Sequence, residues 1–361
     1  MKKYQICNHC VMDETAKEIT FNKDGICNFC KEYEEKKLNM YHGEEKRQRL
    51  SQLIEKIRKD KKGKYDLILG VSGGVDSTYL AYKLKELGLK ILAVHVDNGW
   101  NTELSVKNVK RICEKLDIPL YTYCLDWEEF KDLQLSFLKA SVPDLEIPTD
   151  HAIVAVLYKV AEENNVKYIA RGRNFVTEAI LPESWSQGHS DWKYIKGIQN
   201  IFGTKELKKF PHFDLFKGGK LLLKYKRIAP LDYMDYNRED AKKVLIEKLG
   251  WEDYGGKHLE SIYTRFVQGY ILPFKFGFDK REAHLSTEIN AGTMTREKAL
   301  EILNKPSYNE KLMKEDREKI IEKLGINQEQ FNQYMSLPNK SIDDYPSYKK
   351  ILKLMKKFKR D

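Results

Sequence analysis

The segment over residues 65–88 constrains the fold of this chain more than any other feature. The run YDLILGV (65–71) is typical of a buried parallel strand, SGGVDS (72–77) follows at once, and an apolar pattern of helical period then continues to Gly88. Glycines let the backbone approach an anion closely, and the start of a helix adds N–H donors. The segment therefore predicts an α/β protein with a parallel sheet and a phosphate site where the helix begins.

The SGGVDS loop differs from the two best-known phosphate-binding loops. The chain contains neither G-x-x-x-x-G-K-[ST] nor G-x-G-x-x-G. Its hydroxyl donors are Ser72, Ser77 and Thr78, and Asp76 lies in the first helical turn, where the helix dipole favours a carboxylate. Asp76 is also suited to hold a magnesium ion that neutralises phosphate charge. A turn without function is the alternative, and the position between a strand and a helix argues against it.

A second predicted strand, KILAVHVD (90–97), is followed by the polar loop NGWN (98–101). Ligands of open parallel sheets bind at the carboxyl ends of the strands, so this loop can place His95, Asp97 or Asn98 beside a base or a ribose. An ordinary connecting loop is the alternative. The position directly after the SGGVDS unit favours nucleotide binding.

Four of the six cysteines form two pairs, Cys7-x-x-Cys10 and Cys27-x-x-Cys30. This spacing is typical of four thiolates around one structural zinc ion, with a short hairpin between the pairs. An iron–sulfur cluster, a redox dithiol and two disulfides are the alternatives. Four thiolates leave no open coordination position, so we expect no catalysis at this metal, and His9 is expected to be a spectator.

The net charge of +10, from 64 Lys+Arg against 54 Asp+Glu, raises the question of a nucleic-acid partner. The positive charge is segmental: residues 203–231 carry net +6 and the last 22 residues net +5, whereas residues 65–202 carry net −4. This distribution favours partner docking and one anionic-substrate site over a broad RNA-binding face. We find no apolar run that could span a membrane and no secretory signal, so we expect a cytoplasmic protein.

Scattered motifs resemble the PP-loop ATP pyrophosphatases, a superfamily that includes GMP synthetase, NAD synthetase and the tRNA-thiolating enzymes. SGGVDS resembles their pyrophosphatase loop and HVDNGW their adenosine-binding strand. VKYIARGRNFVTEA (166–179) resembles the segment that carries Gly-x-Asn facing the nucleotide, and IAPLDY (228–233) resembles the segment that ends the domain. The resemblance implies that ATP is split into AMP and pyrophosphate, and that AMP is transferred to a carbonyl oxygen that a nitrogen or sulfur nucleophile then displaces.

Further motifs are similar to one branch of that superfamily, the bacterial N-acetyl sugar amidotransferases of the WbpG and PseA type. They are CNHCVMDET, GICNFC, EIPTDHA, RNFVTEAILPESW, GGKHLESIYTRFVQGYILP and FDKREAHLS, and they cover nearly the whole chain. The resemblance implies conversion of an acetamido group into an acetamidino group on a surface-polysaccharide or flagellar sugar, carried by a nucleotide or present as a sugar acid. It also implies ammonia from a glutaminase partner, similar to the glutaminase–cyclase pair of histidine biosynthesis.

The remaining two cysteines show no glutaminase signature. Cys113 falls in a helical pattern and Cys124 in a strand pattern, and both are expected to be core residues. If the resemblance holds, ammonia must therefore come from outside this chain. The sequence leaves the sugar, its carrier and homo-oligomerisation open.

The C-terminal part reads as mainly helical, with segments such as EDREKIIEKLG (315–325) carrying apolar residues at helical spacing. Lys280 and His284 are four residues apart and would share one helical face with other cations nearby, a group suited to an anionic sugar nucleotide or sugar acid. A solvated basic face is an equal alternative for any one of them. The aromatic residues Tyr263, Phe266 and Tyr270 are expected in the core.

The motifs divide the chain into a series of parts. GGKLLLKYKR (218–227) is expected to be a strand with lysines facing solvent, and the helical tail that ends the chain is expected to dock on its own domain, with a membrane or a partner as alternatives. The expected parts are a four-cysteine zinc ribbon (1–45), a helical linker (46–64), a doubly wound parallel-sheet PP-loop ATP-binding domain (65–235) and a helical C-terminal substrate or cap region (236–361).

Taken together, the residues and the resemblance assign ATP, Mg²⁺ and structural Zn²⁺ as cofactors and predict these site residues. The catalytic set is Ser72, Asp76, Ser77, Arg173 and Asn174. The ATP-binding set is Gly70, Val71, Ser72, Gly73, Gly74, Asp76, Ser77, His95, Asp97, Asn98 and Gly172. The substrate-binding set is Glu178, Lys257, His258, Arg265, Lys280, Arg281 and His284. The metal ligands are Cys7, Cys10, Cys27 and Cys30.

Two other functions remain as hypotheses. A tRNA-thiolating enzyme of the same superfamily would share the loop and account for the net charge, but no cysteine pair follows the loop to carry sulfur, and we expect no nucleic-acid partner. A zinc-ribbon binding module without catalysis is the other hypothesis, and the intact loop at Ser72, Asp76 and Ser77 argues against it.

Overall fold

The centre of this computed structural model is a parallel sheet. The structure describes residues 4–256, 259–349 and 351, and within them the sheet has five strands in the order β3-β2-β1-β4-β5. Neighbouring strands all pair in parallel, which confirms the predicted doubly wound α/β fold. The strands are β1 (Leu67–Gly70), β2 (Ile91–Asp97), β3 (Leu120–Cys124), β4 (Tyr168–Ala170) and β5 (Lys226–Ile228).

The described residues also form a series of helices. The α-helices up to the end of the sheet are α1 (Asn28–Leu38), α2 (Gly43–Lys59), α3 (Val75–Glu86), α4 (Glu103–Lys115), α5 (Trp127–Ala140), α6 (Ile147–Glu163), α7 (Phe175–Glu178), α8 (Trp192–Phe202) and α9 (Leu215–Lys224). Those that follow are α10 (Arg238–Leu249), α11 (Ile262–Phe266), α12 (Arg281–Ala291), α13 (Arg296–Leu303), α14 (Glu310–Leu324) and α15 (Gln328–Ser336). Short 3₁₀ turns are η1 (Pro230–Tyr233) and η3 (Ile342–Asp344), and η2 (Val267–Phe276) is a π-helix.

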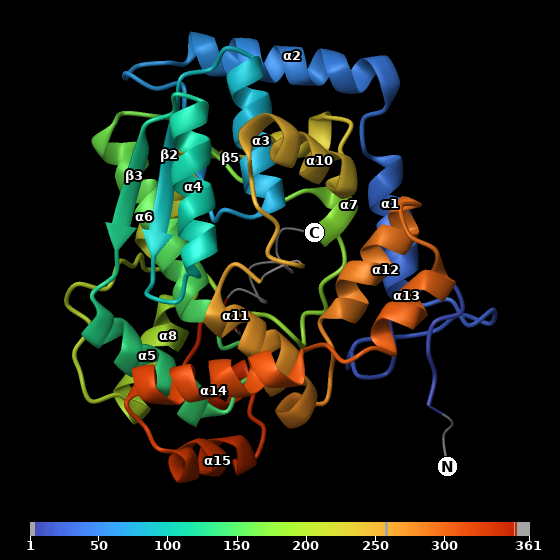
Figure 1. The fold of residues 1–361 in the computed structure, drawn as a ribbon, viewed down its shortest axis with the longest axis vertical. Helices are drawn as coiled ribbons and strands as arrows, with labels where there is room; N and C mark the ends of the chain where they lie inside the picture. The colour runs from blue at the N-terminus through green and yellow to red at the C-terminus, as the bar shows by residue number, and fades with distance from the viewer. Residues whose placement is uncertain (1–3, 257–258, 350, 352–361) are drawn as a thin grey trace.

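Helices cover both faces of the sheet (Figure 1). On one face Leu80 of α3 and Leu245 of α10 join the buried residues of the strands, and α4 packs beside them. On the other face Val156 of α6 and Leu221 of α9 belong to the same buried cluster as Ile68 of β1. The strand order reverses at β1, which pairs with β2 on one side and β4 on the other. Such a switch point is where open parallel sheets bind ligands, and the SGGVDS loop leaves the sheet there.

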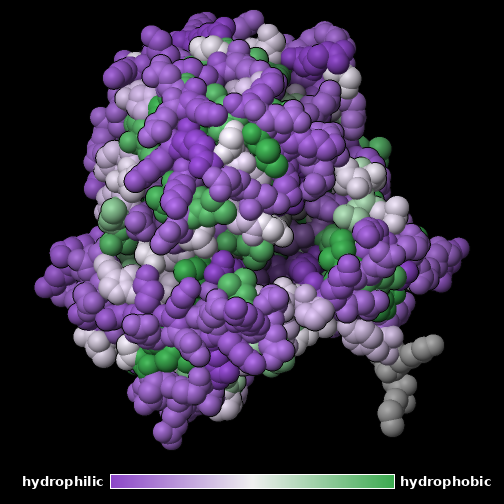
Figure 2. All heavy atoms as spheres, in the orientation of Figure 1, coloured by the Kyte–Doolittle hydropathy of each residue, from purple (hydrophilic) through white to green (hydrophobic). Residues whose placement is uncertain are grey.

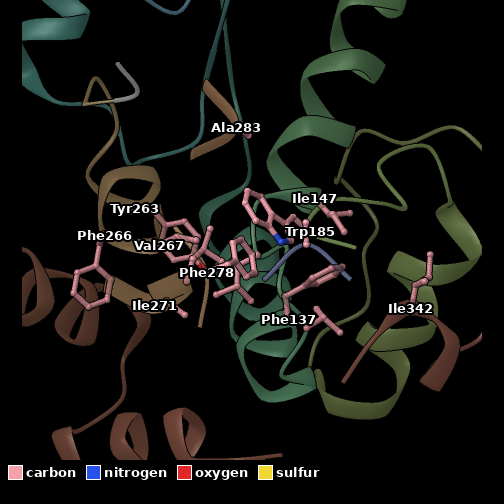
Figure 3. Close-up of a cluster of buried hydrophobic side chains, with 14 of the residues drawn as sticks. Phe137, Ile147, Trp185, Tyr263, Phe266, Val267, Ile271, Phe278, Ala283 and Ile342 are labelled. Carbon is pink, nitrogen blue, oxygen red and sulfur yellow. The ribbon is translucent and has the colours of Figure 1, made fainter. Parts of the chain in front are cut away.

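The N-terminal cysteine segment and the C-terminal helices share one hydrophobic core. Met12, beside the cysteines, belongs to the same buried cluster as Phe266 of α11 and Phe331 of α15. Figure 3 shows part of this cluster, including Phe137 of α5, Phe266 of α11 and Trp185, which stacks on Phe278 with ring centroids 4.5 Å apart. The cysteine segment and the C-terminal helices are therefore packed together and do not form independent units.

Two expectations about local structure are wrong. Residues 218–227 are not one strand: most of them lie in α9, and only the last few belong to β5. Asp214 caps α9 by accepting a hydrogen bond from the Lys217 N–H group (2.7 Å), and this cap, which lies outside residues 218–227, starts the helix. Cys124 is exposed because β3 is an edge strand of the sheet, whereas Cys113 is buried as expected.

Among the helices of the described residues, none is both long and apolar enough to cross a membrane. Figure 2 shows a face that is mostly hydrophilic, with hydrophobic residues gathered only in small groups. Most of the predicted amphipathic tail, including Leu352, Met355 and Phe358, lies outside the described residues; Ile351 is about half exposed, at 48%.

Candidate active site

The SGGVDS loop is held in shape by its own hydroxyl groups. The Gly74 N–H group donates to Ser72 Oγ (3.3 Å), the Ser72 N–H group donates to Ser77 Oγ (3.3 Å), and Ser77 Oγ donates to the Gly74 carbonyl (3.2 Å). α3 begins at Val75, and no side chain caps it at Gly74. Its first N–H groups are therefore left to bind an anion that enters the loop.

Two aromatic residues that follow α10 hold this loop by hydrogen bonds. Trp251 Nε1 and the Tyr254 hydroxyl both donate to the Gly73 carbonyl, each over 2.8 Å. Gly73 has a φ of +85°, and a Cβ there would lie 2.8 Å from the Ser105 carbonyl oxygen. Only glycine suits both the backbone conformation and the close approach to α4. The loop is thus preshaped before any ligand binds.

The loop after β4 lies directly against the start of α3. A Cβ on Gly172 would lie only 2.7 Å from the Ser77 backbone nitrogen, so glycine lets the two segments touch. Tyr236 lies just after η1, and its hydroxyl donates a hydrogen bond to the Asp76 carboxylate. Burial and then the charge of Asp76 raise the pKa of Tyr236, so this phenol stays protonated and remains a donor.

A cavity of about 420 Å³, which we call the loop cavity, opens in front of these segments. Most of the predicted ATP-binding and catalytic residues lie along it, and two residues predicted to bind the sugar, Glu178 and Lys280, lie there as well. The predicted residues that line it are Gly70, Val71, Ser72, Gly74, Asp76, Ser77, His95, Asn98, Gly172, Arg173, Glu178 and Lys280.

Three predicted residues support the loop cavity without lining it: Gly73, Asp97 and Asn174. Asp97 accepts hydrogen bonds from the Gly99 N–H group (2.9 Å) and from Asn101 Nδ2 (3.3 Å), and so shapes the loop after β2. Asn174 caps α7 by accepting a hydrogen bond from the Thr177 N–H group (2.9 Å). The side chains of Asp97 and Asn174 are therefore used in holding the backbone.

His95 is buried and both of its ring nitrogens have partners. Nδ1 lies 3.0 Å from the Val71 carbonyl oxygen and Nε2 lies 3.3 Å from Asn101 Nδ2. The carbonyl can only accept, so these contacts assign the ring proton to Nδ1. His95 therefore ties the loop after β1 to the loop after β2.

A second cavity of about 510 Å³ lies beside the first. Both cavities are lined by Arg238, Gly256, Gln268 and Lys280, so they meet across a common wall. Of the residues predicted to bind the sugar, those that line the second cavity are Arg265, Lys280, Arg281 and His284. Lys257 and His258 lie outside the described residues.

Two of the predicted sugar-binding cations are already engaged by the protein. Arg265 forms a two-pronged ion pair with the fully buried Asp316, with contacts of 2.5 and 2.7 Å. Arg281 pairs with Asp279 and also donates to the carbonyl oxygens of Ile302 and Lys305 at the end of α13. Both guanidinium groups are held in place by these bonds, so they shape the cavity wall and are not available to grip an anion.

Carboxylates gather on the loop-cavity side of the common wall. Glu146 and Asp150 line the loop cavity, and Glu146 accepts a hydrogen bond from Gln268 Nε2 (3.0 Å). Burial raises the pKa of Glu146. Burial acts to lower the pKa of Lys280, but Glu146 and the neighbouring Asp144 and Asp150 outweigh it and raise that pKa. Lys280 is therefore held in its charged form.

Behind this wall His189 lies between Asp144 and Asp150, with Nε2 to carboxylate distances of 3.1 and 3.2 Å. Burial works against its protonation, but hydrogen bonds to the two carboxylates raise the pKa of His189 to about 10. Despite burial, the hydrogen bond to His189 lowers the pKa of Asp144 to about 2. His189 and Asp144 therefore form a charged pair across most of the pH range.

The sequence did not single out Arg238, Glu146, Asp150 or Gln268. Arg238 stands at the first position of a helical pattern, where it reads as part of a helix start. Glu146 and Asp150 lie within EIPTDHA, a motif that carried the family resemblance but no assigned role. The signal in the sequence that could have indicated Glu146 and Asp150 was a polar motif at the start of an apolar helical pattern.

The four paired cysteines form one compact buried cluster. Their Sγ atoms lie within 4.8 Å of one another, and neighbouring pairs are 3.7 to 3.9 Å apart. Four thiolates at about 2.3 Å from a tetrahedral zinc ion would be about 3.8 Å apart, so the cluster fits zinc. The N–H groups of Cys10 and Cys27 point at Cys7 Sγ (3.4 and 3.2 Å), as suits a thiolate.

Comparison with known proteins agrees with this architecture. Residues 43–143 match the model of the PP-loop domain. Residues 260–359 match that of the C-terminal domain of WbpG-like LPS biosynthesis proteins. The fold and the loop thus define a PP-loop ATP pyrophosphatase, a class of ATP-using enzymes. With the second match, the chain belongs to the WbpG-type family of these proteins.

Individual relatives are more distant. A tRNA-specific 2-thiouridylase of Colwellia psychrerythraea is 30% identical over 149 residues, 37% of either chain. An uncharacterised protein of Methanocaldococcus jannaschii is 25% identical over 87% of this chain and 98% of its own. The chain spans only 22% to 37% of the first curated relatives that it matches. The solved structure of NMN synthetase from Francisella tularensis aligns over 83% of this chain and 98% of its own, with 15% identity and a TM-score of 0.36.

Proposed function

We propose that this protein is an ATP-dependent amidotransferase that converts the acetamido group of a bacterial surface-glycan sugar into an acetamidino group. The observation that carries the proposal is the pair of cavities with a common wall. One contains the SGGVDS loop, and the other is formed largely by residues of the WbpG-like C-terminal domain. Such a pair suits a reaction in which ATP and a second substrate must meet.

The proposed chemistry takes two steps. The acetamido oxygen attacks the α-phosphorus of ATP, the bond from that phosphorus to the bridging oxygen breaks, and pyrophosphate leaves. Ammonia then adds to the activated carbon, the C–O bond breaks and AMP leaves. The product is an amidinium ion, and one proton of the ammonia is released. Activation is needed because the oxygen of an amide is a poor leaving group.

The residues of the loop cavity suit the first step. The α3 N-terminus and the hydroxyls of Ser72 and Ser77 would hold the pyrophosphate, and Arg173 would offset its charge. Asp76 would hold a magnesium ion, which neutralises phosphate charge when bound. Asn98 and the loop after β2 would lie against the nucleoside. Glu178 would sit between nucleotide and sugar.

Ammonia is scarce at neutral pH, so we propose a separate glutaminase subunit as its source. Within the described residues, Cys113 is buried inside α4 and Cys124 stands exposed at a sheet edge, and neither is hydrogen-bonded to a histidine. Neither is therefore arranged as a glutaminase nucleophile. A homo-oligomer is compatible with the same proposal.

The proposal is tested with purified protein, ATP, Mg²⁺, ammonium chloride and a set of UDP-linked acetamido sugars and sugar acids. We expect sugar-dependent release of AMP and pyrophosphate. The product should be lighter than the sugar by the mass difference between O and NH. Release of ADP, or AMP release that no sugar stimulates, would contradict the proposal. Ser72→Ala is the matched negative control, since it removes a loop hydroxyl.

A tRNA-thiolating enzyme is the second candidate, favoured by the partial similarity to the 2-thiouridylase. It predicts tRNA binding that weakens steeply as salt is raised, and tRNA-dependent AMP release. The positions of Cys113 and Cys124 speak against it, because they are too different in setting to act as a sulfur-carrying pair. Replacing the sugar by tRNA in the same assay decides between the two functions.

A further inference from the structure

The common wall between the two cavities carries two positive side chains. Of the described residues that line both cavities, Gly256 and Gln268 are uncharged, and Arg238 and Lys280 are cations. They come from separate parts of the chain: Arg238 is the first residue of α10 and Lys280 immediately precedes α12. Two distant segments are thus brought to one boundary, each with a cation.

Neither cation is neutralised by a close partner among the described residues. Arg238 is mostly buried, with 22% of its side chain exposed, and its Nε atom has no hydrogen-bond partner. Its ion pair is with the adjacent Glu239, at a long 3.8 Å. Lys280 makes no hydrogen bond or ion pair with a described residue, although Glu146 and Asp150 lie near enough to hold it charged. Removing a cation from water without such contacts costs free energy unless a ligand supplies the missing partner.

The other two arginines of the second cavity differ in this respect. Arg265 is paired with Asp316, and Arg281 is paired with Asp279 and bonded to backbone carbonyls. Those guanidinium groups have partners that fix them. In contrast, Arg238 has only the long contact with Glu239, and Lys280 has no hydrogen bond or ion pair with a described residue. The available positive charge therefore lies at the boundary and not deep in the second cavity.

The position of this boundary identifies the ligand group, on the basis of the proposed function. If the loop holds the pyrophosphate part of ATP and the acetamido group enters from the second cavity, the phosphorus that joins them must lie between. We propose that Arg238 and Lys280 form an anion site for the α-phosphate of ATP and of the sugar adenylate that follows. A guanidinium fork and an ammonium point charge suit two non-bridging oxygens, on which charge builds up during transfer.

The test measures binding of AMP and of adenosine to the full chain by calorimetry, in saturating pyrophosphate so that the loop is occupied. We expect Arg238→Gln and Lys280→Met each to weaken AMP binding by about tenfold or more, as for a lost charge-assisted hydrogen bond, and to leave adenosine binding unchanged. Lys243→Met is the matched control, because Lys243 is an exposed cation on the same helix as Arg238.

Three outcomes would overturn the assignment: unchanged AMP affinity in both variants, an equal loss of AMP and adenosine affinity, or an equal loss of pyrophosphate affinity measured alone. The last outcome would mean that the two cations help to bind pyrophosphate at the SGGVDS loop. Should a variant fail to fold, Arg238→Lys and Lys280→Arg keep the charge, and a fall in AMP affinity without one in adenosine affinity is still expected. A wild-type protein that binds AMP in this way but modifies no sugar would overturn the proposed function alone.

Discussion

Gly172 is the residue whose replacement should damage the candidate site most directly. In Gly172→Ala the new methyl group would lie 2.7 Å from the Ser77 backbone nitrogen, where no flexible side chain can move aside. We expect ATP affinity to fall by about tenfold or more, and the free energy of unfolding to fall by about 1–3 kcal/mol. Calorimetric ATP titration and chemical denaturation measure both.

Gly219→Ala provides the matched control for that substitution. Gly219 lies in α9, and a Cβ there would meet nothing within 4 Å. The free energy of unfolding should rise by about 0.5–1 kcal/mol because alanine favours the helix, and ATP affinity should not change. Equal behaviour of the two variants would show that crowding at Ser77 is not the cause.

The histidine between two carboxylates should make stability depend on pH. The folded pKa of His189, about 10, exceeds the ordinary value of 6.5, so binding of its proton stabilises the fold. This stabilisation is complete below pH 6.5 and is lost as the pH rises towards 10. The melting temperature of the wild type should therefore fall between pH 6.5 and 9.5 by more than that of His189→Gln.

The comparison is made with His42→Gln, which changes an exposed histidine at the start of α2. That variant should keep the pH dependence of the wild type. Parallel melting curves for His189→Gln and wild type across the same range would contradict the charged arrangement of His189, Asp144 and Asp150.

At this scale the sequence predicts side chains near their own motif and misses those whose role depends on a distant partner. The loop residues Ser72, Asp76 and Ser77 could be placed because a strand and a helix flank them. Whether the Arg265 side chain can bind a ligand could not be judged from the sequence, because its partner Asp316 is 51 residues away. Arg238 was missed because only the fold brings it to the boundary between the cavities.

Among the elements, α12 joins the cysteine cluster to the second cavity. On one side Ser286 Oγ accepts a hydrogen bond from the Val11 N–H group (3.2 Å), and Asn290 Nδ2 lies 3.5 Å from Cys30 Sγ. On the other side His284 and Glu288 line the cavity. After α12, Arg296 donates to the carbonyl oxygens of Cys7 and Cys10. The cluster thus supports a wall of the candidate substrate site.

Removal of the metal should therefore loosen α12. With a chelator that strips the bound ion, hydrogen exchange should speed up in peptides covering α12 and residues 292–295, and metal analysis should show the matching loss of zinc. Peptides from α3, whose buried residues belong to a separate hydrophobic cluster on the sheet, serve as the internal reference. Unchanged exchange in α12 after complete metal loss would contradict the coupling.

Element types were predictable where periodicity and flanking signals agreed. The strands at 65–71 and 90–97 were found because buried apolar runs marked them, and the helix that ends at Leu324 was found because its apolar spacing is followed by Gly325. The prediction for residues 218–227 failed because the segment contains only three consecutive leucines between Lys220 and Lys224, followed by Tyr225 and two further cations, and so short a pattern fits a strand or a helical turn equally well. The helix starts at its N-cap residue Asp214, which lies outside residues 218–227, on which the strand prediction was based.

For the molecule as a whole, the C-terminal half completes the core of the nucleotide-binding half. Trp100, after β2, is fully buried: Tyr263 stacks on it with ring centroids 5.2 Å apart, and Lys323 lies over it at 4.8 Å. The Ile262 N–H group also donates to the Trp100 carbonyl (2.9 Å). These contacts link sequence segments that the motif-based division placed in different parts.

A chain that ends at residue 259 should therefore fail to form a native nucleotide-binding half. Its tryptophan emission should shift to longer wavelength, and it should bind a hydrophobic dye, because Trp100 and its neighbours lose their cover. The full chain is the reference. A shortened chain with native-like emission and ATP affinity would contradict this view of a shared core.

The hydrogen bond between Val11 and Ser286 has a consequence for synthesis on the ribosome. The two residues are 275 positions apart, and at about 5–20 residues per second roughly 15 to 55 seconds pass before the second follows the first. Asn290 and Arg296, which also contact the cysteine segment, arrive later still. During that interval the cysteine segment lacks its contacts with α12, so we expect a metal ion bound by its four thiols to supply much of its stability until α12 has been made.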